Sequence, residues 1–204
     1  MKKKKLAVLI SGGGSNLQAI IDCCKQPDYP AEIVCVISNK ASAYGLERAK
    51  NAGIETVVID HKQYHDRAAF DQAMHERIVA YGAELVCLAG FMRLITPWFI
   101  EQWHNRLINI HPSLLPSFKG LHGPRQALEA GVTIAGCTVH FVREAMDDGP
   151  IIIQAAVPVL PDDTEESLAA RILVEEHRIY PAAIAMIAGG ELVIDGDRIS
   201  RYKH

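Results

Sequence analysis

The first half of the chain alternates between continuous apolar runs and segments in which apolar residues recur at helical spacing. The apolar runs predict buried strands at Leu6–Ile10, Ile33–Ile37, Thr56–Ile59 and Leu85–Ala89. The intervening segments predict helices at Leu17–Cys24, Ala43–Ala52 and Ala68–Tyr81. Because strands that are apolar throughout are buried on both faces, this pattern indicates a parallel sheet with helices on both sides.

The second half opens differently, with a strand that runs into a proline-bracketed loop. Asp163 and Glu166 suit a capping box for a long helix, which Pro181 should kink or interrupt. No linker separates the halves, so the prediction is one α/β domain, 1–204, on a continuous sheet. The elements predicted here are strands at Leu107–Ile110, Cys137–Val142 and Ile151–Val159, helices at Pro124–Ala130 and from near Thr164, and a hairpin of Leu192–Ile194 with Arg198–Ser200.

Composition and charge argue against nucleic-acid-binding, secreted and membrane-spanning proteins. The 204 residues are 49% hydrophobic, enough for a sizeable core, and the net charge is −3. Nonspecific nucleic-acid binding depends on clustered Lys and Arg, so the acidic balance argues against a nucleic-acid partner. The basic start Lys2–Lys5 precedes an apolar run that ends at Ser11 without a cleavage site, which argues against a signal peptide. No run is long enough to cross a membrane, and the five cysteines have no C-x-x-C spacing, so a cytoplasmic location is expected.

A glycine-rich loop, Ser11-Gly12-Gly13-Gly14-Ser15-Asn16, lies between the first predicted strand and the first helix. Backbone N–H groups of glycines approach an anion closely there, and a helix N-terminus adds partial positive charge. The dinucleotide fingerprint fails because Leu17 occupies its last position, and no G-x-x-x-x-G-K-[ST] loop is present. The loop suits a single phosphate monoester, held by amides and by the Ser15 and Asn16 side chains; the alternative is merely a tight turn.

Asn109 and His111 stand two residues apart at the end of a predicted strand, so their side chains project to the same side. An amide can stabilise a developing oxyanion, and an imidazole can shuttle a proton near neutral pH. The alternative is a structural histidine satisfied by the backbone. Asp147 lies between two predicted strands, where it is either a turn residue or a carboxylate that the fold brings to His111.

Other candidate residues carry weaker signals. His61 and His65 have an H-x-x-x-H spacing but lie in a polar segment typical of a loop, so no metal site is expected. The segment around Ser15 does not match G-x-S-x-G, which argues against a nucleophile elbow. His140, in Val139-His140-Phe141, is interpreted as a core or sheet-surface residue.

Six stretches taken together resemble the phosphoribosylglycinamide formyltransferases, a folate-dependent formyltransferase family of purine biosynthesis. They are Leu9–Ile20, Leu88–Arg93, Asn109–Pro116, Gly120–His122, Val139–Val142 and Asp147–Ile152. The resemblance spans nearly the whole chain. It implies a Rossmann-like fold on a mainly parallel seven-stranded sheet, with a nucleotide-phosphate-binding half at 1–105 and a catalytic and folate-binding half at 106–204.

The resemblance also implies an activity: transfer of a formyl group from 10-formyltetrahydrofolate, a co-substrate, to the amino group of glycinamide ribonucleotide, without a metal. Asn109, His111 and Asp147 would form the catalytic trio. The expected partners are the two small molecules, with no nucleic acid and no membrane, and the assembly a monomer or homodimer. The other implied site residues are Gly14, Ser15, Asn16, Arg67 and Glu176 for the nucleotide, and Met92, Arg93, Leu94, Ile95, Arg143 and Asp147 for the folate.

The sequence departs from the family pattern at three places. Gly13 replaces a residue that is often Asn, His122-Gly123-Pro124 replaces a more usual His-Thr-His, and Asp148 stands where Gly is common, which should stiffen the folate-side loop. Among rival readings, methionyl-tRNA formyltransferase should be longer and carry a basic RNA-binding domain. Formyltetrahydrofolate hydrolase should carry an extra N-terminal regulatory domain. A non-catalytic phosphate sensor would explain the glycine loop but not His111 and Asp147.

Overall fold

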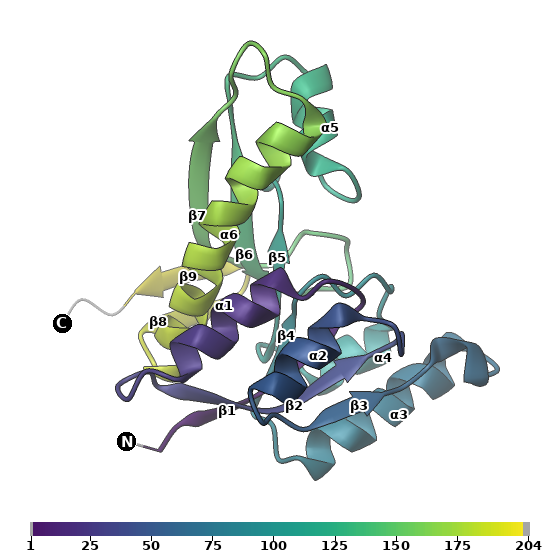
Figure 1. Ribbon diagram of the computed structural model, residues 1–204. Helices are drawn as coiled ribbons and strands as arrows, with labels where there is room; N and C mark the ends of the chain where they lie inside the picture. The colour runs from purple at the N-terminus through teal and green to yellow at the C-terminus, as the bar shows by residue number, and fades with distance from the viewer. Residues whose placement is uncertain (1, 202–204) are drawn as a thin grey trace. The chain divides into compact units, whose positions relative to one another are not determined.

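A computed structural model describes residues 2–201 of the chain (Figure 1). Each predicted strand and helix is present, with bounds shifted by a few residues. In chain order the elements are β1 Lys4–Ile10, α1 Ser15–Cys24, β2 Ala31–Ser38, α2 Tyr44–Asn51, β3 Thr56–Val58, the 3₁₀ turn η1 His61–Gln63, α3 Arg67–Ala80, β4 Leu85–Leu88, α4 Pro97–Gln102, β5 Leu107–His111, α5 Gly123–Glu129, β6 Ile134–Phe141, β7 Ile151–Pro158, α6 Glu165–Ala188, β8 Leu192–Asp195 and β9 Arg198–Arg201.

The strands form one seven-stranded sheet in the order β3-β2-β1-β4-β5-β6-β7, and β8 pairs with β9 in a separate hairpin. β1 runs parallel to β2 and β4, and β2 runs parallel to β3, whereas β6 and β7 are antiparallel. The predicted α/β fold with a mainly parallel seven-stranded sheet is therefore confirmed. The chain divides into two compact units, Met1–Ile108 and Asn109–His204; the functional boundary between 105 and 106 stays a prediction.

In the first unit, the strand β1 lies between β2 and β4. Its residues from Leu6 to Ile10 are apolar and fully buried, as expected for a strand covered on both faces. The chain moves outward from β1 to β2 and β3 and then returns to the other side of β1 with β4. Since parallel crossovers are right-handed, α1 and α2 cover one face of these strands and α3 covers the other. The reversal between β1 and β4 is the switch point at which α/β sheets bind ligands.

In the second unit, the long helix α6 packs against the antiparallel pair β6 and β7 (Figure 1). Its buried side chains include Leu168, Ile172, Ile179 and Ala183, which recur at helical spacing and form one apolar stripe. The helix continues through Pro181 to Ala188, so the predicted interruption does not occur. The apolar stripe on both sides of the proline keeps the helix packed although the proline donates no hydrogen bond.

The N-terminus of α6 corrects a second prediction, because Thr164 and Ser167 form the capping box instead of Asp163 and Glu166. Thr164 Oγ1 accepts from Ser167 N at 3.2 Å, and Ser167 Oγ accepts from Thr164 N at 3.0 Å. Asp163 lies just outside the helix and forms a two-pronged ion pair with Arg171. The carboxylate is therefore engaged by the guanidinium, which leaves the capping position to its neighbour.

One helix of the first unit, α4, has no counterpart among the predicted elements. It begins after Thr96, whose Oγ1 accepts from Phe99 N at 3.4 Å, and Pro97 lies in its first turn. A threonine cap followed by proline is a signal for a helix start. The helix has only six residues, too few for apolar periodicity to reveal it.

Candidate active site

The glycine-rich loop of the first unit lies at the switch point, between the end of β1 and the start of α1. Gly14 precedes α1 with a left-handed backbone, φ 69°. A cavity of about 390 Å³ opens here, at the N-terminus of a ten-residue helix whose backbone N–H groups favour an anion. The residues that line it include the three predicted to bind the phosphate and are Ser11, Gly12, Gly13, Gly14, Ser15, Asn16, Lys40, Ala89, Gly90 and Met92.

Helix α2 holds this loop in place. Gly45 N donates to Gly12 O at 3.0 Å, and Arg48 Nε donates to Gly13 O at 2.8 Å. A β-carbon on Gly14 would lie 2.7 Å from Gly45 Cα. Glycine is required at this position both for the positive φ and for the close approach of the two backbones. The loop is therefore a tight turn, and it also borders the cavity in which the phosphate is predicted to bind.

Gly14→Ala is expected to lower the free energy of unfolding by about 1–3 kcal/mol, because alanine combines a strained φ with backbone crowding. Gly13→Ala is the matched control, since a β-carbon at Gly13 meets nothing within 4 Å. Urea denaturation of the two variants measures the difference. Equal unfolding midpoints would contradict the prediction.

The folate-contact residues predicted in the first unit follow β4. Met92 is 64% exposed and Leu94 57%, so the apolar surface of both side chains is available to a ligand. Ser11 Oγ accepts from Met92 N at 2.8 Å, which ties the start of this segment to the glycine loop. Arg67, predicted to contact the nucleotide, is the first residue of α3, and its side chain is exposed.

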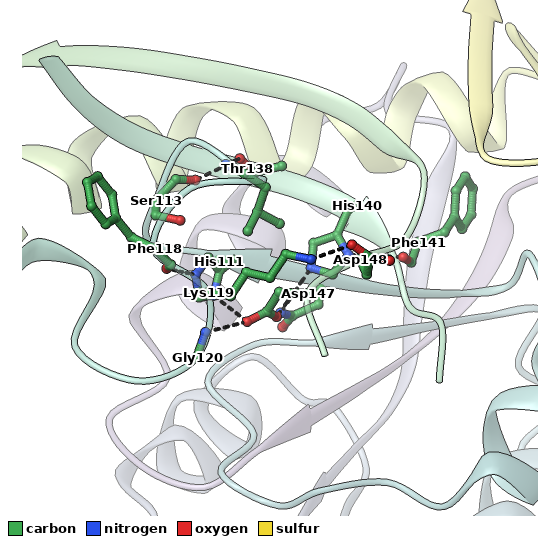
Figure 2. Close-up of polar contacts among 12 residues, drawn as sticks. His111, Ser113, Phe118, Lys119, Gly120, Thr138, His140, Phe141, Asp147 and Asp148 are labelled. Atoms are coloured by element: carbon green, nitrogen blue, oxygen red, sulfur yellow. Dashed lines mark hydrogen bonds and ion pairs between the residues drawn. The ribbon is translucent and has the colours of Figure 1, made fainter. Parts of the chain in front are cut away.

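The structure brings the three predicted catalytic residues of the second unit into one polar cluster. Figure 2 shows His111, His140 and Asp147 of this cluster. β5 ends in Asn109-Ile110-His111, and the buried His111 faces the loop that carries Asp147, with 3.5 Å between His111 Nδ1 and Asp147 Oδ2. His140 of β6 completes the cluster. Its Nε2 lies 3.4 Å from Asn109 Nδ2 and 3.8 Å from Asp147 Oδ1. The fold therefore connects Asn109 to Asp147 through a second histidine.

Backbone carbonyls orient both imidazole rings. His140 Nδ1 lies 2.9 Å from Phe141 O, so the hydrogen-bond pattern assigns the proton to Nδ1 and leaves Nε2 to accept from the Asn109 amide. Burial lowers the pKa of His140 below its usual value of 6.5, which favours this neutral form. His111 Nε2 lies 3.0 Å from Phe118 O and donates to it, so Nδ1 is the ring nitrogen that faces Asp147.

The loop between β6 and β7 places Asp147. The backbone of Asp147 is left-handed, with φ 50°, a conformation that Asp adopts more readily than most residues. Asp147 Oδ2 accepts from Gly120 N at 2.8 Å, which anchors the carboxylate beside His111. A β-carbon on Gly149 would overlap the carbonyl oxygen of Phe141. Only glycine lets this loop lie so close to the end of β6.

Two of the departures from the family pattern have a structural account. Asp148, where the family commonly has Gly, forms an ion pair with Lys119 (Figure 2). In the His122-Gly123-Pro124 segment, a β-carbon on Gly123 would lie 2.7 Å from Pro112 O. The first turn of α5 therefore packs directly on the loop that follows His111, and Gly123 permits that contact.

His140 is the cluster residue that the interpretation of the sequence missed. It lies in a strand whose residues from Ala135 to Phe141 are all buried. A buried imidazole needs hydrogen-bond partners, so a histidine inside an apolar run was a signal that other polar residues face it.

The buried His140 predicts how stability depends on pH. Its folded-state pKa lies below the unfolded value of about 6.5, so the unfolded chain binds more protons than the folded chain as the pH falls below that value. The contribution of His140 is present in full above the unfolded pKa and is lost as the pH falls toward the lowered folded pKa. Between about pH 7.5 and pH 5.5, the urea midpoint should therefore fall more in the unmodified protein than in His140→Gln.

His104→Gln is the control for this experiment, because His104 is exposed and belongs to the first unit, whereas the cluster belongs to the second. It should lose as much stability on acidification as the unmodified protein. If His140→Gln loses just as much, the assignment of a neutral buried His140 is wrong.

The remaining predicted site residues of the second unit lie on α6 and after β6. Glu176 is buried on α6, and Arg143 is half-buried, with burial lowering the pKa of its guanidinium. Among residues 2–201, no group of three or more His, Cys, Asp or Glu side chains is arranged to hold a metal ion. Within the same range, no helix has both the length and the apolar composition needed to cross a membrane.

Comparison with known proteins connects these residues to a family. The model of the formyl transferase family matches residues 4–184. The phosphoribosylglycinamide formyltransferase of Escherichia coli (strain K12) is 47% identical over 201 residues, which cover 95% of each chain. The crystal structure of glycinamide ribonucleotide transformylase 1 from Symbiobacterium toebii is 55% identical, with a TM-score of 0.97 and coverage of 98% of this chain and 95% of that one.

Other relatives are much longer than this chain. The trifunctional purine biosynthetic protein adenosine-3 of Bos taurus is 54% identical over 189 residues, which are 93% of this chain and 19% of the relative. The chain thus spans a fifth or less of the length of such relatives. With a family model matched over most of its length and a relative 47% identical along nearly all of both chains, the protein belongs to the formyl transferase family, among the phosphoribosylglycinamide formyltransferases.

Proposed function

We propose that this chain transfers a formyl group from 10-formyltetrahydrofolate to the amino group of glycinamide ribonucleotide, a step of purine biosynthesis. The proposal is carried by the cluster of Asn109, His111, His140 and Asp147, present in a chain that is 47% identical to a relative named for this reaction. The two co-substrates are the partners that the reaction requires. A cytoplasmic location and a monomeric or homodimeric assembly remain predictions.

In the proposed mechanism, the uncharged glycinamide amine attacks the formyl carbon directly. The new C–N bond forms as the carbonyl π pair moves onto oxygen, which gives a tetrahedral intermediate with an oxyanion. Asn109 has two amide N–H groups, so one can point at His140 Nε2 while the other donates to the oxyanion. Protonated His111 is the second donor, and it must exchange its bond to Phe118 O for one to the oxyanion.

The second step breaks the bond between the formyl carbon and the folate nitrogen. The electron pair on oxygen re-forms the carbonyl, and the folate nitrogen leaves with the proton that the amine has lost. Asp147 supports this transfer in two ways: its negative charge stabilises the positive charge on His111, 3.5 Å away, and it can hold a water that relays the proton. No covalent intermediate with the protein is needed.

The proposal assigns the other predicted residues to the two substrates. The glycine loop, with Gly14, Ser15 and Asn16, holds the nucleotide phosphate, because its cavity lies at a helix N-terminus. Arg67 and Glu176 contact the nucleotide, with Glu176 near the amino acceptor. The segment Met92–Ile95, Arg143 and Asp147 contact the folate.

A substrate-dependence assay tests this function. The purified protein is incubated with 10-formyltetrahydrofolate, with and without glycinamide ribonucleotide, and the release of tetrahydrofolate is followed. Transfer predicts release only with the nucleotide, together with an equal amount of formylated nucleotide. Release at the same rate without the nucleotide would instead support formyltetrahydrofolate hydrolase, and no release in either mixture would overturn the proposal.

A further inference from the structure

The segment Met92–Ile95, to which the proposed function assigns folate contacts, has no regular secondary structure. Its large apolar side chains Met92 and Leu94 are mostly exposed. Such side chains bury little surface and so contribute little to fixing a conformation. The shape of the segment is therefore set where its two ends attach to the rest of the first unit.

Ser11 holds the start of the segment. Its backbone N donates to Gly90 O at 3.1 Å, and its Oγ accepts from Met92 N at 2.8 Å. The same hydroxyl donates to Asn39 Oδ1 at 2.6 Å. Ser11 and Asn39 are both buried, so these bonds are shielded from competition with water and the backbone on either side of Phe91 is fixed.

Asp71 of α3 holds the other end. One of its oxygens, Oδ2, accepts two hydrogen bonds from Thr96, one from the backbone N–H and one from the hydroxyl, each at 2.7 Å. The Thr96 hydroxyl also accepts from Phe99 N as the cap of α4. The residue that follows the segment is thus held by backbone and side chain through a single carboxylate that is 0% exposed.

A buried carboxylate is a costly way to join α3 to α4. Asp71 shares α3 with the buried apolar residues Phe70 and Met74, and its second oxygen, Oδ1, is buried with no hydrogen-bond partner among the described residues. Packed apolar residues would join two helices at least as stably. The carboxylate supplies direction instead, because its bond to the Thr96 N–H fixes where the chain enters α4.

The surroundings of Asp71 also point to the binding residues. Burial raises the pKa of Asp71, while the bonds from Thr96 and the charges of Arg67 and Arg93 oppose that rise. Two arginines that the proposed function assigns to the substrates therefore lie within electrostatic reach of this carboxylate.

We propose that Asp71 is a positioning residue that, through Thr96, holds Met92–Ile95 in the conformation that binds the folate. This inference rests on the proposed function and adds to it a residue that does not touch the substrate. It predicts that breaking the contact weakens folate binding more than it slows the chemical step.

The test uses Thr96, whose side chain bonds to Asp71 and Phe99 among the described residues and is not itself assigned to either substrate. Thr96→Val removes the hydroxyl, and Thr96→Ser keeps it. For Thr96→Val, the KM for 10-formyltetrahydrofolate should rise about tenfold, the effect of losing the hydroxyl bond to Asp71. The kcat should stay within about twofold of the unmodified protein. Thr96→Ser should restore the original KM. Direct titration with tetrahydrofolate should show the same order of affinities.

A double-mutant cycle tests whether Asp71 acts through Thr96. Asp71→Ala alone should also raise the folate KM. Asp71→Asn should keep the KM close to that of the unmodified protein, because an amide oxygen still accepts a hydrogen bond. Adding Thr96→Val to Asp71→Ala should raise the KM little further. Thr164→Val is the matched control, since it removes a threonine cap hydroxyl from α6. It should lower the thermal midpoint and leave the folate KM unchanged.

The outcomes separate this inference from the proposed function. If the unmodified protein transfers formyl groups and Thr96→Val has an unchanged folate KM, or if Thr164→Val raises it equally, the positioning role is overturned alone. If the unmodified protein neither binds the folate nor turns over, the proposed function is overturned and the positioning role with it.

Discussion

Asn109→Ala is expected to slow formyl transfer by roughly 10²–10³-fold, as the loss of one oxyanion donor does in other enzymes. His111→Ala should slow it by roughly 10²–10⁴-fold, because it removes a proton-transfer group as well as a charge. Both side chains project from the end of β5 into the polar cluster, so the strand itself should persist. Single-turnover rates with saturating substrates measure the chemical step directly.

The double variant strengthens this test. If Asn109 and His111 act on the same oxyanion, the double variant should lose a smaller factor in rate than the product of the two single-variant factors. Asn51→Ala is the control, because it removes an asparagine side chain at an exposed position at the end of α2 and should leave the rate unchanged. A single-turnover rate within about threefold of the unmodified protein would remove the substituted residue from the mechanism proposed here.

The fold was readable from the sequence mainly because its inner strands are buried on both faces. In β1 the run from Leu6 to Ile10 contains no polar residue, so the strand is evident without knowledge of its neighbours. The cap of α6 was not readable in the same way, because Asp163 and Thr164 are adjacent and both suit the position. The ion pair between Asp163 and Arg171 decides between them, and that pair depends on where the loop before the helix turns.

The parts of the candidate site that depend on the alternation of side chains along one strand could be predicted from the sequence. The parts that depend on how neighbouring strands pair could not. Asn109 and His111 share a side because they stand two residues apart on one strand. His140 enters the cluster on β6, where the register against β7 shifts between Val139 and His140. The extra residue at this shift lies on β7, and no periodicity in the sequence predicts where such an irregularity falls. The position of Asp147 depends on the loop that follows β6, and the left-handed backbone of Asp147 itself helps to shape that loop.

Asp147→Asn is expected to reduce the rate of the chemical step by at least about 10²-fold while leaving the fold intact. The amide oxygen of asparagine can still accept from Gly120 N, so the anchor of the loop is kept. The negative charge 3.5 Å from His111 Nδ1 is lost, and with it the stabilisation of the positive charge that His111 carries as it holds the transferred proton. Single-turnover kinetics at saturating substrates measure the loss, and urea denaturation confirms that the variant is folded.

Asp148→Asn is the matched control, because it neutralises the neighbouring carboxylate on the same loop. Asp148 pairs with Lys119 at a half-exposed position, where an ion pair contributes little to stability, and no contact joins it to His111. A merely structural role for Asp147 predicts that the two substitutions change the rate to the same small extent. A catalytic role predicts a large rate loss for Asp147→Asn and a near-normal rate for Asp148→Asn. Equal rates for the two variants would show that Asp147 is a turn residue without a catalytic role.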